Sequence, residues 1–308
     1  MKPLVVIAGP TACGKTAASI ELAKRLNGEI ISADSMQIYK HMDIGTAKPM
    51  PEERQGIKHY LIDELFPDEE YSVCTFAHLA RQYAREIYAK GKTPILVGGT
   101  GFYINAFIND TEFTGTTADP DLRERMYNMA REQGNGAVYE ILRAIDPEAC
   151  ETIHSNNLKR VIRAIEFHSQ TGKKISGHNR EQKEKTGCYN TAFFVLHMPR
   201  EKLYRRIEER VDSMIEHGLA DEVRRLLDMG YSPGLTSMRG LGYKELIPYI
   251  QGGITLPQAI ETLKRNTRHF AKRQITWFKH QSDGYWIDID EFDNIDIMLD
   301  RISQQHTL

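Results

Sequence analysis

A glycine-rich segment near the N-terminus constrains the fold more than any other feature of this 308-residue chain. It follows a β-branched apolar run, Leu4 to Ala8, and precedes a segment of helical periodicity, Ala17 to Leu26. Its eight residues match the pattern GxxxxGK[ST] and are Gly9, Pro10, Thr11, Ala12, Cys13, Gly14, Lys15 and Thr16. Backbone N–H groups of such a loop surround phosphate oxygens at a helix N-terminus. The sequence therefore predicts a phosphate-binding loop (P-loop) for a di- or triphosphate.

The last two residues of this loop carry most of its predicted chemistry. Lys15 would neutralise the terminal phosphates, and the hydroxyl of Thr16 would join the coordination shell of Mg²⁺. A glycine-rich turn without a ligand is the alternative, and the flanking strand and helix patterns argue against it. ATP-binding proteins use the same motif, so the loop alone does not identify the reaction.

Strand and helix patterns alternate through the first hundred residues, which is typical of βαβ units and a parallel sheet. From about residue 122 to 172 the pattern is helical, and the polar segment 178–191 is expected to be a loop. Strand patterns return at 193–196 and 286–289, with long helices between them. We therefore predict an α/β fold, a P-loop NTPase-like parallel sheet core with an inserted all-helical domain. The predicted domains are 1–114 (first part of the core), 115–188 (helical insertion) and 189–308 (second part of the core).

Asp34 follows the second predicted strand, at the carboxyl edge where ligands of parallel α/β sheets bind. A carboxylate there can bind Mg²⁺ through water or accept a proton from an attacking group. An N-cap of the next element is the other interpretation. A kinase or NTPase would place a further acid after a neighbouring strand, but the strand 94–97 is followed by Gly98, Gly99 and Thr100.

Thr100 lies among three glycines, 98, 99 and 101, which we expect to allow close approach of a ligand. It could donate a hydrogen bond to a leaving-group oxygen, or merely cap a helix. Arg206 and Arg210 are four residues apart in a predicted helix, hence on one face, where two guanidiniums would suit a pyrophosphate. Ordinary surface ion pairs are equally compatible with that spacing.

Composition narrows the function classes. Hydrophobic residues make up 41% of the chain, enough for a sizeable core, and the formal net charge of −2 excludes a globally basic nucleic-acid binder. Basic residues nevertheless cluster. Segment 158–185 has eight against three acids, and segment 262–282 has six and no acid. Two such clusters favour a polyanionic partner over solvated helix faces.

The cysteine content and the lengths of the apolar runs bear on the cellular compartment of the protein. The four cysteines, at 13, 74, 150 and 188, form no CxxC motif and suggest no disulfide framework, so a reducing cytoplasm is expected. No apolar run approaches the ~20 residues of a membrane span.

Seven blocks of the sequence carry a more specific signal: GPTACGKT, SADSMQIYKHMDIGTAKP, LVGGTGFY, NLKRVIRAIE, RIEERVDSMIEHGLADEV, RGLGYKE and AKRQITWFK. Together they resemble the tRNA dimethylallyltransferases (tRNA isopentenyl transferases), and the likeness extends from residue 4 to about 286. No cysteine lies beyond Cys188, so the chain resembles the bacterial type, which lacks a C-terminal zinc finger.

The resemblance implies transfer of the dimethylallyl group of dimethylallyl diphosphate to the exocyclic amine of the adenosine 3′-adjacent to the anticodon, with release of pyrophosphate. The P-loop would then hold an isoprenoid diphosphate instead of ATP, with Mg²⁺ as cofactor. By likeness to the family, Asp34 would be the general base, Thr100 would lie near the reacting groups and Arg210 would bind the pyrophosphate.

The same resemblance implies the contacts with tRNA. The helical insertion resembles the domain that binds the anticodon stem. No membrane partner is expected, and the enzyme is expected to be a monomer. The implied tRNA-binding residues are Asp34, Ser35, Met36, Gln37, Thr100, Arg123, Lys159, Arg160, Val161, Ile162, Arg163, Arg239, Gly240, Leu241, Gly242, Tyr243 and Lys244.

Three other functions remain open at this level. A P-loop kinase would turn over ATP, an RNA-binding module would keep only a vestigial loop, and a cytokinin-type transferase would act on free AMP or ATP. The missing strand-terminal acid argues against the kinase, and the intact Lys15 and Thr16 argue against the vestigial loop. The basic insertion argues for tRNA over a free nucleotide.

Overall fold

The computed structural model describes residues 1–111, 119–184, 187–292 and 295–305. The chain forms two compact units, one built from Met1–Ile108 with Cys188–Leu308 and one from Asn109–Gly187. We call them the core unit and the helical unit. The boundary predicted between residues 114 and 115 falls within 112–118, outside the described residues, so the predicted domain limits stay a prediction.

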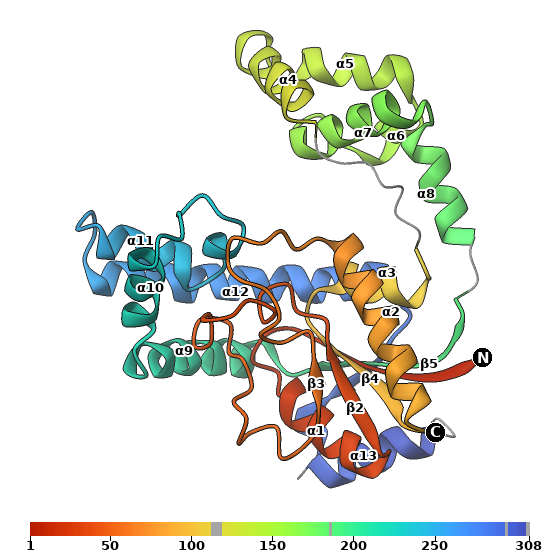
Figure 1. The fold of residues 1–308 in the computed structure, drawn as a ribbon, viewed down its shortest axis with the longest axis vertical. Helices are drawn as coiled ribbons and strands as arrows, with labels where there is room; N and C mark the ends of the chain where they lie inside the picture. The colour runs from red at the N-terminus through yellow and green to blue at the C-terminus, as the bar shows by residue number, and fades with distance from the viewer. Residues whose placement is uncertain (112–118, 185–186, 293–294, 306–308) are drawn as a thin grey trace. The chain divides into compact units, whose positions relative to one another are not determined.

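The core unit contains one six-stranded sheet in the order β3-β2-β4-β1-β5-β6. All its strand pairs are parallel, so the predicted parallel α/β sheet is confirmed (Figure 1). Buried β-branched and aromatic residues fill its central strands, as expected of a sheet covered on both faces. The strands are β1 (Lys2–Ala8), β2 (Gly28–Ser32), β3 (His59–Tyr60), β4 (Thr93–Gly98), β5 (Tyr189–His197) and β6 (Tyr285–Asp288).

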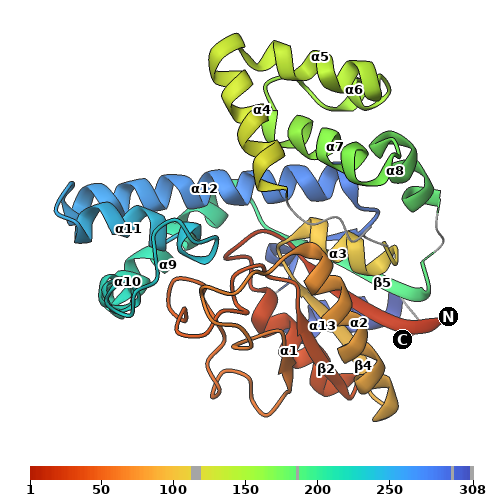
Figure 2. The same ribbon diagram turned by 45° about the horizontal axis from the view of Figure 1, so that its top comes forward.

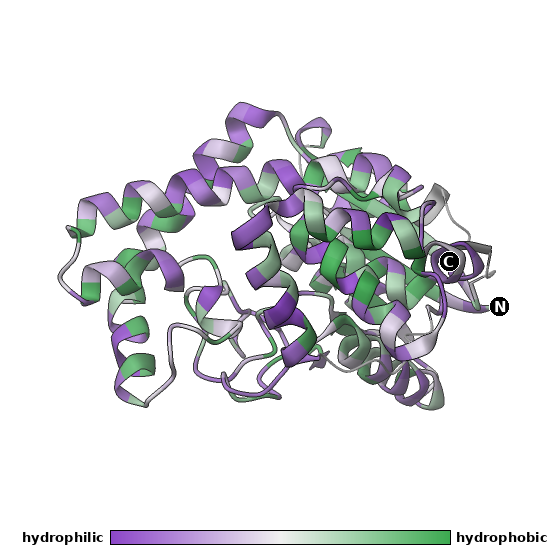
Figure 3. Ribbon diagram, turned by 90° about the horizontal axis from the view of Figure 1, so that it is seen from above, coloured by the Kyte–Doolittle hydropathy of each residue, from purple (hydrophilic) through white to green (hydrophobic). Residues whose placement is uncertain are grey.

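Helices pack around this sheet, and the longest, α12, has α9 and α11 packed against it (Figure 2). Figure 3 shows hydrophobic and hydrophilic residues alternating along these helices, as expected when one face is buried and the other faces water. The helices of the core unit are α1 (Lys15–Arg25), α2 (Val73–Ala89), α3 (Gly101–Ile108), α9 (Arg200–Glu216), α10 (Leu219–Asp228), α11 (Tyr243–Ile250), α12 (Leu256–Gln281) and α13 (Ile295–Gln305), with short 3₁₀ turns at Ser237–Arg239 and Ile289–Glu291.

The helical unit has its own hydrophobic core, in which buried residues such as Val138, Leu142 and Val161 pack together. No strand occurs among its described residues, in agreement with the sequence pattern. Its helices are α4 (Pro120–Gln133), α5 (Asn135–Ile145), α6 (Ala149–Thr152), α7 (Leu158–Thr171) and α8 (Ile175–Glu184).

The loop predicted over 178–191 is wrong, because α8 extends to Glu184 and β5 begins at Tyr189. The polarity of α8 hides the helix from a search for apolar periodicity. A long-range cap stabilises its start. The backbone N–H and hydroxyl of Ser176 donate to the buried carboxylate of Asp146 at 2.9 and 2.7 Å.

Within the described residues, no helix is both long and apolar enough to cross a bilayer.

Candidate active site

Three neighbouring strands bring the predicted site residues to one edge of the sheet. The P-loop follows β1, Asp34 lies just beyond β2, and Thr100 just beyond β4, and the sheet order places β4 between the other two. A backbone hydrogen bond joins the loop after β4 to the loop after β2, since Thr100 N–H donates to the carbonyl of Ala33 at 3.3 Å. The chain thus places its phosphate loop, its acid and its threonine at the carboxyl edge, where ligands of parallel sheets bind.

Two cavities open at this edge, and six residues line both: Thr11, Asp34, Thr46, Ala47, Arg210 and Phe270. The larger, about 460 Å³, is lined by the P-loop residues Gly14, Lys15 and Thr16, and we call it the P-loop cavity. The smaller, about 320 Å³, is lined by Thr100 and the segment 239–244, and we call it the second cavity. Two adjoining cavities that share a carboxylate can hold two substrates with their reacting ends together.

The P-loop has the geometry that phosphate binding requires. Gly14 precedes α1 with a φ of 84°, a left-handed conformation that favours glycine. An ideal Cβ at Gly9 would lie 2.4 Å from the carbonyl oxygen of Leu196, so only glycine fits there. The ammonium of Lys15 donates to the carbonyl of Pro10 at 2.6 Å, which holds it over the loop. Gly9, Pro10 and Cys13 do not line the cavity, and Cys13 is fully buried.

Asp34 borders both cavities, and its carboxylate is already oriented by its own backbone. It accepts the N–H of Met36 at 2.8 Å and of Gln37 at 3.4 Å, a local turn instead of the cap of a regular helix. Burial raises the pKa of Asp34, while the Met36 N–H and the charge of Lys15 oppose that shift. A carboxylate with a raised pKa is a stronger base than an ordinary aspartate, as proton abstraction requires.

Arg210 reaches the same edge from α9. Its guanidinium donates to the hydroxyl of Thr11 at 3.5 Å and borders both cavities. Burial lowers the pKa of Arg210, and the neighbouring Arg206 adds to that effect. A guanidinium nevertheless stays charged at neutral pH, so a partly desolvated cation faces the P-loop cavity. Arg206 also lines this cavity, in agreement with the predicted pair of guanidiniums.

The glycines around Thr100 serve packing within the protein, and Gly98 and Gly99 also line the P-loop cavity, so the approach of a ligand to them stays a prediction. An ideal Cβ would lie 2.2 Å from the Ala33 carbonyl oxygen at Gly98, 2.1 Å from the Gln274 amide nitrogen at Gly99 and 2.0 Å from the Trp277 ring at Gly101. Each is shorter than any real Cβ contact. The glycines therefore let α12 and the end of β2 approach the loop that carries Thr100.

Gln274 of α12 was not predicted from the sequence, although it joins two of the strand-end loops. Its side-chain oxygen accepts the N–H of Thr11 at 2.9 Å, and its amide donates to the carbonyl of Gly99 at 2.9 Å. Phe270, one turn earlier, borders both cavities. The only sequence signal for them is their place in the block AKRQITWFK and the basic segment before it.

The segment 239–244, which contains predicted tRNA-binding residues, forms one wall of the second cavity. Met36 and Ser35 lie in this lining, whereas Gln37 lines the P-loop cavity instead. The lining residues from the segment are Arg239, Gly240, Leu241, Gly242, Tyr243 and Lys244.

The helical unit holds the remaining predicted tRNA-binding residues. Arg123 and Arg163 both bind the fully buried carboxylate of Glu166, at 2.8 and 2.7 Å. Burial by itself would raise the pKa of Glu166, but these hydrogen bonds and the N–H of Asp119 lower it to about 2. Glu166 therefore holds both guanidiniums in place, and each remains 40% exposed.

The two apolar residues of the predicted RNA-contact stretch face inward. Val161 and Ile162 are 0% and 2% exposed and belong to the core of the helical unit. Lys159 and Arg160 are exposed. The side chains of this stretch that can reach a polyanion are therefore the basic ones.

Comparisons with known proteins show the family of the chain. The model of the IPP transferase family matches residues 37–281, and the P-loop lies before the matched part. A tRNA dimethylallyltransferase of Acetivibrio thermocellus is 54% identical over 96% of this chain and 94% of its own length. One of Lachnoclostridium phytofermentans is 52% identical with the same coverage.

Solved structures extend the likeness to the fold. The tRNA isopentenylpyrophosphate transferase of Bacillus halodurans is 43% identical with a TM-score of 0.75, covering 99% of this chain and 96% of that one. A eukaryotic dimethylallyltransferase acting on tRNA has a TM-score of 0.83 at 32% identity, covering 99% and 80%. Sequence, fold and site agree, and the chain belongs to the IPP transferase family of tRNA dimethylallyltransferases.

Proposed function

We propose that this protein transfers the dimethylallyl group of dimethylallyl diphosphate to the exocyclic amine of the adenosine 3′-adjacent to the anticodon of tRNA. It is a prenyltransferase that modifies tRNA. The observation that carries the proposal is the position of Asp34, whose carboxylate borders a phosphate-binding cavity on one side and a second, base-sized cavity on the other. We further propose that the enzyme is a monomer and acts on its tRNA in the cytoplasm.

The diphosphate of the donor occupies the P-loop cavity in this proposal. Loop N–H groups, the helix N-terminus and the ammonium of Lys15 supply positive potential for its oxygens. Arg210 and Arg206 supply guanidiniums from the opposite side. Phe270 and Ala47 border both cavities, so the apolar five-carbon chain can extend from the diphosphate toward the second cavity.

Mg²⁺ would be held by the hydroxyl of Thr16 in this proposal. The described residues contain no group of three metal-binding side chains. The donor set fits Mg²⁺ bound with a diphosphate, because this ion takes few protein ligands and completes its shell with phosphate oxygens and water. Bound there, it would neutralise charge on the leaving pyrophosphate.

The acceptor base occupies the second cavity, and it must leave its stack to reach a buried carbon. An adenine amine is a weak nucleophile because its lone pair is delocalised into the ring. As the new N–C bond forms, Asp34 accepts the proton of the amine, and the allylic C–O bond breaks. The pyrophosphate leaves with the electron pair, stabilised by Lys15, Arg210 and the loop amides. Thr100, at the edge of this cavity, lies beside the reacting groups.

The choice of donor tests this assignment directly. We expect the protein to bind dimethylallyl diphosphate far more tightly than ATP, because the strand beside the P-loop ends without the acid that kinases use. Isothermal titration with each ligand in Mg²⁺ buffer measures the difference, and mass spectrometry of nucleosides from unmodified tRNA detects the product. Robust phosphoryl transfer from ATP, without prenylated adenosine, would contradict the proposal.

The helical unit is proposed to bind the anticodon stem of the tRNA. Its exposed cations, together with the guanidiniums held by Glu166, supply the positive charge that phosphates require. Arg123, Lys159, Arg160 and Arg163 are the residues assigned to this contact. Val161 and Ile162 support it from the core.

Charge reversal of Lys159 and Arg160 to glutamate is expected to raise the KM for tRNA about tenfold or more and to leave donor affinity unchanged. Both side chains are exposed, so the substitution leaves the core of the unit intact. The salt dependence of tRNA binding should weaken as well, since fewer counterions are released. Filter binding between low and physiological salt measures this slope. Arg143 on α5, paired with Glu140, offers a matched control, and an unaltered slope in the double variant would remove the cluster from the interface.

A further inference from the structure

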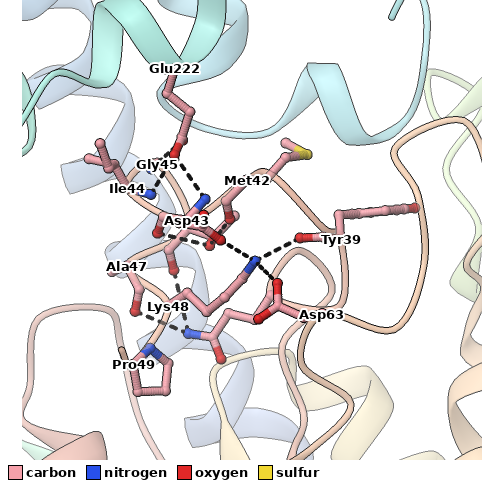
Figure 4. A network of polar contacts seen from close by, with 12 residues as sticks. Tyr39, Met42, Asp43, Ile44, Gly45, Ala47, Lys48, Pro49, Asp63 and Glu222 are labelled. Carbon is pink, nitrogen blue, oxygen red and sulfur yellow. Dashed lines mark hydrogen bonds and ion pairs between the residues drawn. The ribbon is translucent and has the colours of Figure 1, made fainter. Parts of the chain in front are cut away.

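A buried carboxylate on α10 holds the two walls of the second cavity together. Glu222 is 1% exposed and lies outside the lining of both cavities. Its oxygens accept three consecutive backbone N–H groups, of Asp43 at 3.0 Å, Ile44 at 2.9 Å and Gly45 at 3.1 Å (Figure 4). A fourth bond comes from the hydroxyl of Tyr243 at 2.7 Å.

These four donors belong to two separate segments that border the cavity. The loop that follows Gly45 contributes Thr46 and Ala47 to both cavities, whereas Tyr243 belongs to the wall formed by residues 239–244. The walls also touch directly. A Cβ at Gly45 would lie 2.6 Å from the Tyr243 ring, and one at Gly240 would lie 2.5 Å from the terminal methyl of Met36.

The loop is anchored on its other side as well. The buried ammonium of Lys48 binds the carboxylates of Asp43 and Asp63 and donates to the carbonyl of Tyr39 at 2.8 Å (Figure 4). Gln37 donates to the carbonyl of Ala47 at 3.3 Å. Lys48 and Gln37 thus anchor the loop to its own surroundings. Its connection to the 239–244 wall consists of the four hydrogen bonds of Glu222 and the packing of Gly45 on Tyr243.

A carboxylate suits this position because it only accepts hydrogen bonds. Two oxygens offer about four lone-pair sites, which matches the four donors. Burial and the charge of Glu222 raise the pKa of Tyr243 well above its usual value, so its hydroxyl stays protonated and donates. A glutamine would turn an N–H₂ group toward N–H donors, and at least one backbone group would lose its partner.

We propose that Glu222 is a positioning residue for the acceptor: by joining the loop 43–47 to Tyr243, it sets the width of the cavity that receives the adenine. The inference rests on the proposed assignment of the second cavity to the acceptor base. Glu222 touches neither substrate and acts through the residues that it holds. Its loss should therefore impair use of tRNA far more than binding of the diphosphate. Lys15, Thr16 and Arg210 make none of these contacts, and Gln37 still holds the carbonyls of Thr46 and Ala47, which also border the P-loop cavity.

The test compares Glu222→Gln with Asp221→Asn, its neighbour on the same helix, whose side chain is 76% exposed and forms an ion pair with Arg224. Steady-state prenylation of unmodified tRNA gives KM and kcat, and titration gives the Kd for dimethylallyl diphosphate. We expect Glu222→Gln to raise the KM for tRNA at least tenfold and to change the donor Kd less than twofold. Asp221→Asn should match the wild type in both.

Tyr243→Phe removes a single donor from the network and keeps the ring, so it tests the link even if Glu222→Gln fails to fold. We expect it to raise the KM for tRNA severalfold with donor Kd unchanged. Combined with Glu222→Gln, its effect should be smaller than the product of the two, because both break the same link.

An unchanged KM in both variants, or an equal loss of donor and tRNA binding with a lowered Tm, would overturn the positioning role. A wild-type protein that does not prenylate tRNA would instead contradict the proposed function, so the two failures are distinguishable.

Discussion

Replacing Asp34 by asparagine is expected to lower the single-turnover rate by ~10²- to 10⁴-fold while both substrates still bind. Asparagine keeps the size of the side chain and an oxygen that can accept the N–H of Met36, but it cannot accept the proton of the amine. The loss should therefore appear in the chemical step, measured by rapid quench with donor and tRNA saturating. Donor affinity, measured by titration, serves as the control for an intact P-loop.

The pH dependence of the same step gives a second test of Asp34. Because its pKa is raised, the carboxylate should take up a proton at a higher pH than an ordinary aspartate, and the single-turnover rate should fall as the pH decreases through that value. The Asn variant should lack this acidic limb.

The raised pKa also predicts the effect of Asn on stability. A pKa above the unfolded value means that the folded state binds the proton more tightly, so stability decreases as the pH rises through these values. A neutral Asn should be at least as stable as Asp34 at neutral pH, measured by thermal unfolding. A near-normal rate in the Asn variant would refute the base, and recovery of activity by added Mg²⁺ would move Asp34 to the metal site.

Replacing Lys15 by alanine is expected to weaken donor binding about tenfold to a hundredfold and to slow the chemical step as well. A hydrogen bond to a charged group contributes roughly 1.5–3 kcal/mol, which corresponds to that loss of affinity. The ammonium should matter more as negative charge develops on the leaving pyrophosphate, and loss of one such donor typically costs about 10²- to 10³-fold in rate. Titration with dimethylallyl diphosphate and single-turnover kinetics separate the two effects.

Lys24→Ala is the matched control for this prediction. Lys24 lies on the same helix, is 40% exposed at its side chain and pairs with Glu21 at 2.7 Å. It lines neither cavity, although it also donates to Gln55, which borders the P-loop cavity. Its replacement should leave affinity and rate within twofold of the wild type, because exposed ion pairs contribute little. Equal effects of the two substitutions would show that net charge, and not the position of Lys15, governs binding.

The contiguous features of this site could be predicted from the sequence. The P-loop is a run of eight residues between a strand and a helix, and its ligand is bound mostly by its own backbone, so local spacing suffices. Asp34 and Thr100 could be placed at the carboxyl edge because each follows an apolar strand pattern. The periodicity of the long helices likewise located α9, α10 and α12.

Periodicity in the sequence does not predict a helix whose apolar residues lack a regular helical spacing. The helix α3 is apolar on nearly all sides and α8 is polar throughout, so neither shows a clear amphipathic stripe, and α11 is only eight residues long and contains Pro248. Each of these helices is stabilised by the elements that it packs against or by a distant capping residue such as Asp146. Such long-range contacts cannot be inferred from the spacing of residues within the helix.

Only the tertiary structure decided which distant residues complete the site. Gln274 binds the P-loop and the Gly99 carbonyl from a helix more than a hundred residues away, and the glycines beside Thr100 are explained by that helix. Glu222 and Tyr243 join the cavity walls, and Glu166 orients two arginines, through contacts between separate helices and loops. These contacts depend on how packed elements approach one another. The sequence by itself determined the phosphate loop and the strand-end residues, because a short run of consecutive residues suffices to define each of them. The fold determined the cavity, because its shape depends on side chains that meet only after packing.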